Sequence, residues 1–251
     1  MKKLLVIGIG AGNPDYITMQ AVKALNLVDV FFLMDKGQSK DKLIDLRREI
    51  CERYITDRDY RFVEAHSPER ERGDVDYKAS VEDLNLAKQR TFERLISEEM
   101  TDEQCAGFLV WGDPALYDST IRILQAILAS GRCVFEFEVI PGITSVQALA
   151  AQHKVPLNRI GRSIEITTGR RLAAGQVSDA DSLVVMLDAE DSYHRVADQE
   201  TEIYWGAYLG TPDEILISGK LREVADEIER VRKAARLANG WIMDTYLLRK
   251  P

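Results

Sequence analysis

Short apolar runs alternate with helix-forming segments along this chain, and that alternation limits the folds that it can adopt. In the first half the runs are almost wholly apolar, which is typical of strands covered on both faces. These runs are residues 4–9, 30–34 and 107–111. Amphipathic segments at 40–54 and 75–100 separate them. Strands separated by helices indicate a mostly parallel sheet in this half.

The second half contains the same two kinds of segment, but its strands follow one another more closely. The expected strands are residues 134–139, 164–166, 183–186, 203–205, 215–217 and 241–248. Because short loops cannot hold the helical crossover of a parallel connection, we expect a mixed sheet there. The sequence therefore predicts an α/β fold with two α/β domains, residues 1–116 and 117–251, that divide near residues 112–117.

The composition argues against several classes of protein. Lys and Arg total 33 against 41 Asp and Glu, a formal net charge of -8, so a general nucleic-acid binder is not expected. The cysteines, Cys51, Cys105 and Cys133, form no CxxC pair, which disfavours a disulfide framework or a cysteine zinc site and fits a reducing compartment. No run approaches the roughly 20 apolar residues that span a bilayer. We expect a cytoplasmic protein with no membrane segment and no metal.

The first apolar run ends in a glycine-rich loop, Gly8-Ile9-Gly10-Ala11-Gly12, and Asp35 ends the next run. A dinucleotide site would use this order, with the acidic residue on the ribose. However, the glycines are spaced GxGxG rather than GxGxxG, and residues 13–15 add a loop before any helix. The helix N-terminus is then displaced from the place of a phosphate, which disfavours a dinucleotide-dependent reductase. The alternative interpretation is a tight turn in which the glycines only allow the backbone to bend.

Four turn motifs occur in a fixed order. They are VIGIGAGNPD at 6–15, WGDP at 111–114, VIPGITS at 139–145 and LGTPDE at 209–214. This ordered set resembles the tetrapyrrole methylases, S-adenosylmethionine-dependent enzymes that methylate ring carbons of uroporphyrinogen and of corrin precursors. The resemblance covers nearly the whole chain. It implies that each chain has two α/β domains with the active-site cleft between them, and that two chains form a homodimer. It also implies S-adenosylmethionine as cofactor and S-adenosylhomocysteine as its product.

The resemblance assigns the cofactor contacts to these motifs and to the strand at 183–186. The assigned residues are Ala11, Trp111, Gly112, Asp113, Leu116, Thr144, Ser145, Met186 and Gly210. Sharp turns at strand ends expose the backbone donors and acceptors that adenine and the methionine part of the cofactor need. The chain departs from its relatives at Ala11, where they commonly have proline.

The segments at 35–37, 46–50 and 68–72 are most similar to the deacetylating branch of the family, which methylates C1 of precorrin-5 and releases acetate. Asp35 is then the candidate acid-base residue, because parallel sheets bind ligands at the carboxyl ends of their strands. Arg70, Arg72 and Tyr117 are the candidate substrate residues. Arginine suits the many carboxylates of such a macrocycle.

Each of these assignments has an alternative. Asp35 could cap a helix or pair with Lys36, and the two arginines could pair with the glutamates interleaved with them. The enzyme could be another methyltransferase of the same fold, acting on a different corrin carbon or on the acceptor of diphthine synthase or of the ribosomal-RNA methylase. The acidic composition counts against an RNA acceptor. A binding module without catalysis is a further alternative, although all four motifs are intact.

Overall fold

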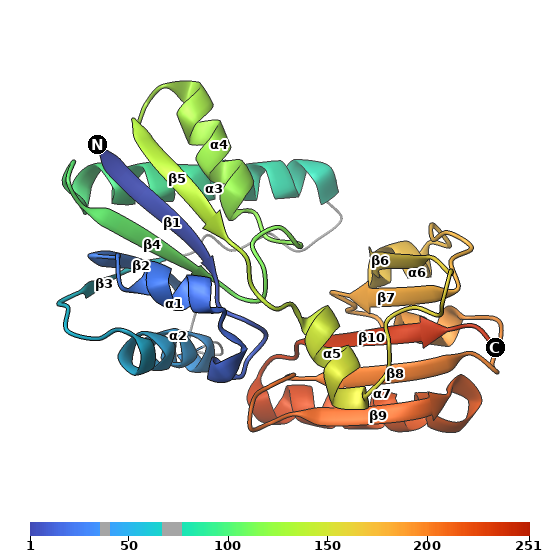
Figure 1. The fold of residues 1–251 in the computed structure, drawn as a ribbon. Helices are drawn as coiled ribbons and strands as arrows, with labels where there is room; N and C mark the ends of the chain where they lie inside the picture. The colour runs from blue at the N-terminus through green and yellow to red at the C-terminus, as the bar shows by residue number, and fades with distance from the viewer. Residues whose placement is uncertain (36–40, 67–76) are drawn as a thin grey trace. The chain divides into compact units, whose positions relative to one another are not determined.

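The computed structural model describes residues 1–35, 41–66 and 77–251, with side chains for all of these except 35, 41, 42 and 77–82. The chain forms two compact units, each built on a five-stranded sheet (Figure 1). The first unit comprises Met1–Gly10 and Pro14–Ile143, and the second comprises Ala11–Asn13 and Thr144–Pro251.

The first unit is a parallel sheet in the order β3-β2-β4-β1-β5. Its elements alternate as the apolar runs predict. They are β1 (Lys2–Gly8), the 3-10 helix η1 (Pro14–Tyr16), α1 (Met19–Leu25), β2 (Val30–Asp35), α2 (Asp41–Tyr54), β3 (Arg61–His66), α3 (Tyr77–Glu98), β4 (Cys105–Val110), α4 (Thr120–Ser130) and β5 (Phe135–Ile140).

Both faces of this sheet are covered, which explains why its central strands are continuously apolar. Leu5 and Ile7 of β1 pack into a core with α1 and α2, whereas Leu4 and Val6 pack into a second core with α3 and α4. Figure 1 shows the two helix pairs on opposite sides of the sheet. Because the five strands are parallel, their carboxyl ends all lie at one edge of the sheet, where each strand leads into a loop.

The chain divides later than the sequence predicted. We expected the boundary at 112–117, but β5 pairs with β1 from Lys2–Phe135 to Ile7–Ile140, so α4 and β5 belong to the first unit. The division falls after Ile143. The reason for the difference is that β5 is an edge strand with a partly exposed, alternating pattern, which resembles the strands of the second half more than its own sheet.

The second unit holds the mixed sheet that the short connections predicted. Its order is β6-β7-β10-β8-β9; β6 and β7 are parallel and the other pairs are antiparallel. Its elements are α5 (Ser145–His153), β6 (Ile164–Thr168), α6 (Gly169–Ala173), β7 (Ser182–Met186), the 3-10 helix η3 (Ser192–Arg195), β8 (Glu202–Ala207), β9 (Ile215–Lys220), α7 (Leu221–Asn239) and β10 (Asp244–Arg249). Trp205, Tyr193 and Tyr246 are its largest fully buried side chains.

No helix within the described ranges has the length and the apolar character needed to cross a membrane.

Candidate active site

Three glycines pack against one another where β1, β4 and β5 end. A Cβ atom at Gly8 would lie 2.6 Å from the amide nitrogen of Gly142 and 2.9 Å from the carbonyl oxygen of Gly112. A Cβ atom at Gly142 would lie only 2.1 Å from that same oxygen. The three strand ends can approach this closely only because Gly8 and Gly142 have no side chain, which leaves room for the Gly112 carbonyl. Three of the predicted motifs thus meet in the first unit.

Polar contacts hold these loops together. Gly10 and Gly112 form an isolated antiparallel bridge, with N···O distances of 2.8 and 3.3 Å. The Asp113 carboxylate accepts hydrogen bonds from the amides of Gly142 and Ala115, each at 2.8 Å. Asp113, predicted as a cofactor contact, therefore ties the loop after β4 to the loop after β5.

Trp111, also at this edge, presents a group that fits a bound ligand. Its indole Nε1 is buried and has no hydrogen-bond partner among the described residues. A buried N–H without an acceptor costs free energy, so such atoms are uncommon unless a ligand or water completes them. An acceptor atom of the predicted cofactor is one group that could do so.

In the second unit, the end of the glycine-rich loop packs on the LGTPDE turn. A Cβ atom at Gly12, which has φ +145, would lie 2.3 Å from the carbonyl oxygen of Leu209. Gly210 has φ 77, and its amide donates to Glu214 at 2.7 Å. The predicted contacts Ala11 and Gly210 therefore belong to one tightly packed pair of turns.

A second group of predicted contacts meets at the start of α5. Thr144 caps this helix, its hydroxyl accepting from the amide of Val146 at 3.1 Å. The hydroxyls of Ser145 and Thr245 lie 3.0 Å apart, and Thr245 is the register partner of Met186 in the sheet. Thr245 thus joins two predicted contacts, although sequence reasoning did not select it. The only sequence signal was a polar residue beside Asp244 at the start of β10, and its burial and its pairing with Met186 are evident only from the structure.

Three non-glycine residues beside these motifs adopt the left-handed backbone conformation. They are Tyr117 (φ 53), Leu187 (φ 54) and Tyr208 (φ 50). Two of them directly follow the predicted contacts Leu116 and Met186, and the third precedes Gly210 by two residues. Such strain persists only where the surroundings enforce it, and it gathers at ligand sites. Leu187 is 62% exposed, so burial of its side chain does not explain its conformation.

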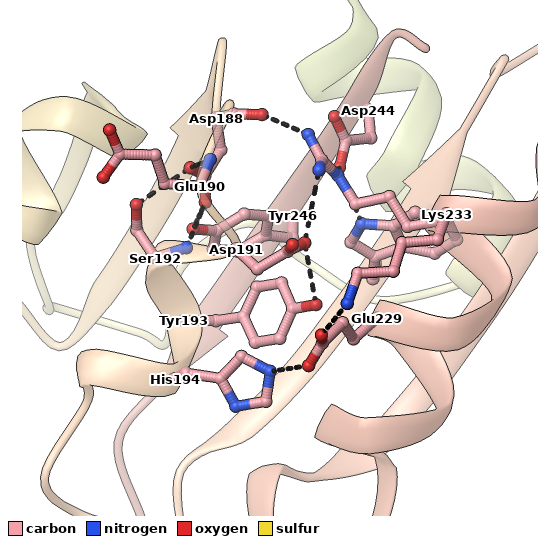
Figure 2. A network of polar contacts seen from close by, with 12 residues as sticks. Asp188, Glu190, Asp191, Ser192, Tyr193, His194, Glu229, Lys233, Asp244 and Tyr246 are labelled. Atoms are coloured by element: carbon pink, nitrogen blue, oxygen red, sulfur yellow. Dashed lines mark hydrogen bonds and ion pairs between the residues drawn. The ribbon is translucent and has the colours of Figure 1, made fainter. Parts of the chain in front are cut away.

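The segment after Met186 is fixed by a buried carboxylate (Figure 2). Asp188 accepts four hydrogen bonds: from the amide and hydroxyl of Ser192 at 2.7 and 2.8 Å, from Tyr246 at 2.7 Å and from the amide of Glu190 at 3.0 Å. Burial, and then the Asp188 charge, raises the pKa of Tyr246 well above its ordinary value. The Tyr246 hydroxyl therefore stays protonated and donates to Asp188.

The candidate catalytic and substrate residues are less fully described. Asp35 ends β2 and pairs with His66 of β3, so its backbone lies at the carboxyl edge of the sheet as predicted, but its side chain lies outside the described atoms. Arg70 and Arg72 lie outside the described residues. Tyr117 is 45% exposed in the loop after β4. These roles stay predictions. In the described part of the chain, no group of three or more His, Cys, Asp or Glu side chains could hold a metal ion.

Comparison with known proteins identifies relatives along the full length of the chain. Over 250 residues it is 53% identical to a precorrin-6A synthase [deacetylating] of Sinorhizobium sp., covering 100% of this chain and 96% of the relative. The structure matches that of a cobalamin synthesis related protein of Corynebacterium diphtheriae with a TM-score of 0.83 and 35% identity, covering 99% and 98% of the two chains.

A more distant structure shares the fold. It is the uroporphyrin-III C-methyltransferase of Thermus thermophilus complexed with S-adenosyl homocysteine, with a TM-score of 0.59 and 17% identity over 99% of this chain and 97% of that one. The family model of the tetrapyrrole (corrin/porphyrin) methylases matches residues 3–225. The four ordered motifs, the α/β fold and these relatives agree: the chain belongs to the tetrapyrrole methylase family.

Proposed function

We propose that this chain is an S-adenosylmethionine-dependent C-methyltransferase of cobalamin biosynthesis that methylates C1 of precorrin-5 and releases acetate, giving precorrin-6A. The single observation that carries this proposal is the 53% identity to the precorrin-6A synthase [deacetylating], which extends over 100% of this chain and 96% of the relative. Relatives that act at other positions of the macrocycle are much less similar; the cobalt-precorrin-4 C(11)-methyltransferase of Priestia megaterium, for example, is 22% identical.

The direct test is incubation with precorrin-5 and S-adenosylmethionine that carries an isotopic label in its methyl group. The proposal expects one labelled methyl group on the macrocycle and one molecule of free acetate for each turnover. Methyl transfer without acetate would move the enzyme to another step of the same pathway. No methyl transfer to precorrin-5 would refute the proposal.

We propose the nine residues that the family resemblance assigned in the sequence as the cofactor contacts. The cofactor, when bound, supplies an electrophilic methyl group on a sulfonium. The chain's own contribution is to bind and orient, which provides most of the catalysis in an in-line displacement. Support comes from the glycine packing around Gly112, from the turn at Gly210 and from the unsatisfied Trp111 indole.

Replacing Trp111 with phenylalanine tests the indole contact. If Nε1 donates to the cofactor, Trp111→Phe should weaken S-adenosylhomocysteine binding by about 1 kcal/mol, roughly fivefold. Calorimetry measures the affinity, and thermal unfolding with and without ligand separates it from the effect of the smaller ring. The ligand-induced rise in the unfolding midpoint should shrink. An unchanged rise would show that Nε1 does not contact the cofactor.

We propose Asp35 as the acid-base residue, since its backbone ends β2 at the edge where parallel sheets bind ligands. Asp35→Asn keeps the size of the side chain but removes the base. We expect kcat to fall by about 10²-fold or more, the range of general acid-base catalysis, with unchanged affinity for S-adenosylhomocysteine. A rate equal to that of the unmodified enzyme would assign Asp35 a structural role.

We also propose that the enzyme is a cytoplasmic homodimer. The family resemblance supports the dimer, and light scattering of the purified protein tests it. The free thiols of Cys51 and Cys105, both buried, support a reducing compartment. We propose a tetrapyrrole as its small-molecule substrate, and we propose binding to neither nucleic acid nor a membrane.

A further inference from the structure

The ion-paired cations of the first unit differ in burial from two of its cations, Arg47 and Lys88, that form no ion pair among the described residues. Those that form ion pairs are solvent-exposed, each with at least a third of its side-chain surface accessible. They are Lys3, Arg48, Arg53, Arg58, Arg61, Arg94 and Arg132. Two more deeply placed cations, Arg47 and Lys88, have no carboxylate within ion-pair distance among the described residues. In most proteins the opposite is found: a buried cation has a carboxylate partner, because an unpaired charge is costly to remove from water.

Arg47 reaches from α2 to the end of β4. Its Nε donates to the carbonyl of Leu109 at 3.0 Å, and its Nη1 donates to the carbonyl of Leu43 at 2.6 Å. Burial lowers the pKa of Arg47 to about 10, and the charge of Asp118 opposes this only in part. Because a guanidinium has five N–H donors, its two terminal nitrogens still hold donors for another group. The charge is held in place but not neutralised.

The Leu109 carbonyl is available to Arg47 because two strands separate there. β2 pairs with β4 only as far as Phe32–Phe108, whereas it pairs with β3 up to Asp35–His66. The last residues of β4 therefore lack β2 as a neighbour. Arg47 fills this position at the carboxyl edge of the sheet, on the same edge as Asp35.

Lys88 approaches the same edge from α3, on the other face of the sheet. Its ammonium lies 3.4 Å from the hydroxyl of Ser119, in the loop that follows β4. Burial lowers the pKa of Lys88, and again the charge of Asp118 opposes the shift. Asp118 thus acts on both cations from one loop, and that loop also contains Tyr117, a predicted substrate residue.

We propose that Arg47 and Lys88 form a receptor for carboxylate groups on the side chains of the substrate macrocycle. This inference rests on the proposed function, since precorrin-5 carries many carboxylates. Arg47 keeps one N–H donor on Nη1 and two on Nη2 after its two carbonyl bonds, and such paired donors match a carboxylate in the two-pronged geometry that guanidinium favours. Lys88 adds a second positive charge beside the loop. In a chain with a net charge of -8, such local cations are needed to bind a polyanion.

Arg47→Gln is the main test, and Arg48→Gln is its matched control. The two arginines are neighbours on α2, but Arg48 pairs with Glu64 on the surface and stacks 4.5 Å above the Phe62 ring. We expect Arg47→Gln to raise KM for precorrin-5 by about tenfold to a hundredfold, the effect of losing one charge-assisted contact. Its kcat should change by less than about threefold and its affinity for S-adenosylhomocysteine should not change. Arg48→Gln should match the unmodified enzyme.

A binding measurement separates this inference from the proposed function. Uroporphyrin III, a stable macrocycle with eight carboxylates, serves as the probe, and quenching of its fluorescence reports binding. Arg47→Gln and Lys88→Met should each weaken its binding, and added salt should weaken binding to the unmodified enzyme more than to either variant. If the unmodified enzyme does not methylate precorrin-5, the proposed function fails, while the probe still decides the role of the two cations.

Two results would overturn the inference. One is unchanged KM and unchanged uroporphyrin affinity in Arg47→Gln. The other is an equal loss in Arg48→Gln, which would show that any positive charge on α2 acts alike. If Arg47→Gln does not fold, because the Leu109 carbonyl loses its donor, then Lys88→Met and the charge-retaining Arg47→Lys carry the test. Arg47→Lys should then bind the probe more weakly than the unmodified enzyme, since lysine lacks the paired donors.

Discussion

Replacing Gly142 with alanine is expected to abolish measurable binding of S-adenosylhomocysteine. The new methyl group would lie 2.1 Å from the carbonyl oxygen of Gly112 and 2.9 Å from Cα of Gly8. These are backbone atoms at the ends of β4 and β1, so they cannot rotate away as a side chain could. Relief requires the loops to separate, which displaces the Gly112–Asp113 turn and costs about 1–3 kcal/mol of stability.

Calorimetry with S-adenosylhomocysteine measures this effect, and Gly131→Ala is the matched control. Gly131 ends α4 with φ +68, and a Cβ atom there would meet nothing within 4 Å. Its alanine variant should lose about 1 kcal/mol of stability through backbone strain alone and keep full cofactor affinity. Unimpaired binding by Gly142→Ala would show that the glycine packing does not shape the cofactor site.

The sequence predicted those parts of the fold that depend on local patterning. The runs at 4–9, 30–34 and 107–111 correspond to β1, β2 and β4 because strands covered on both faces must be apolar throughout. The close spacing of the later strands correctly predicted a mixed sheet. The domain boundary was misplaced because an edge strand such as β5 alternates whichever sheet it joins. Only its pairing with β1 reveals its sheet.

The loops of the candidate site were predictable from the sequence because they depend on turns, whereas contacts that depend on strand register or on burial were not. Glycine and proline mark the motif loops in the sequence itself. Thr245 is distant in sequence from both Ser145 and Met186; the alignment of β10 with β7 brings it beside Met186, and a hydroxyl contact joins it to Ser145 of α5. The sequence alone does not distinguish the roles of Arg47 and Arg48, two adjacent arginines in one helical segment. One is desolvated against a carbonyl and the other is paired on the surface, a difference set by the three-dimensional packing.

The buried ion pair of the second unit is another feature that depends on three-dimensional packing. It joins α7 to β10 near the Asp188 network of Figure 2. Arg232 Nε donates to Asp244 at 2.9 Å, and Nη1 lies 3.3 Å from Asp191. The indole of Trp205 donates to the same oxygen of Asp244 at 3.0 Å. Burial alone would lower the pKa of Arg232, but these carboxylates raise it overall. Burial raises the pKa of Asp244, and Arg232 opposes that rise.

Arg232→Met is therefore expected to be the most destabilising of the substitutions considered, with a loss of about 3–5 kcal/mol at neutral pH, since it leaves a buried carboxylate without its cation. The double variant Arg232→Met/Asp244→Asn should recover much of this loss. Asparagine removes the buried charge but retains an acceptor for the Trp205 indole. Urea unfolding measures both free energies, and a double variant no more stable than the single one would contradict this account.

The pH dependence provides a second test of the same pair. Without Arg232, the pKa of Asp244 in the folded state should rise further above its ordinary value of 3.8. A group with a raised folded-state pKa contributes stability that is fully present below the unfolded-state pKa and is lost as pH rises through the folded-state pKa. The stability difference between Arg232→Met and the double variant should therefore shrink from pH about 7.5 towards pH about 5. A constant difference over that range would show that the cost comes from lost packing of the arginine stem, because packing does not titrate.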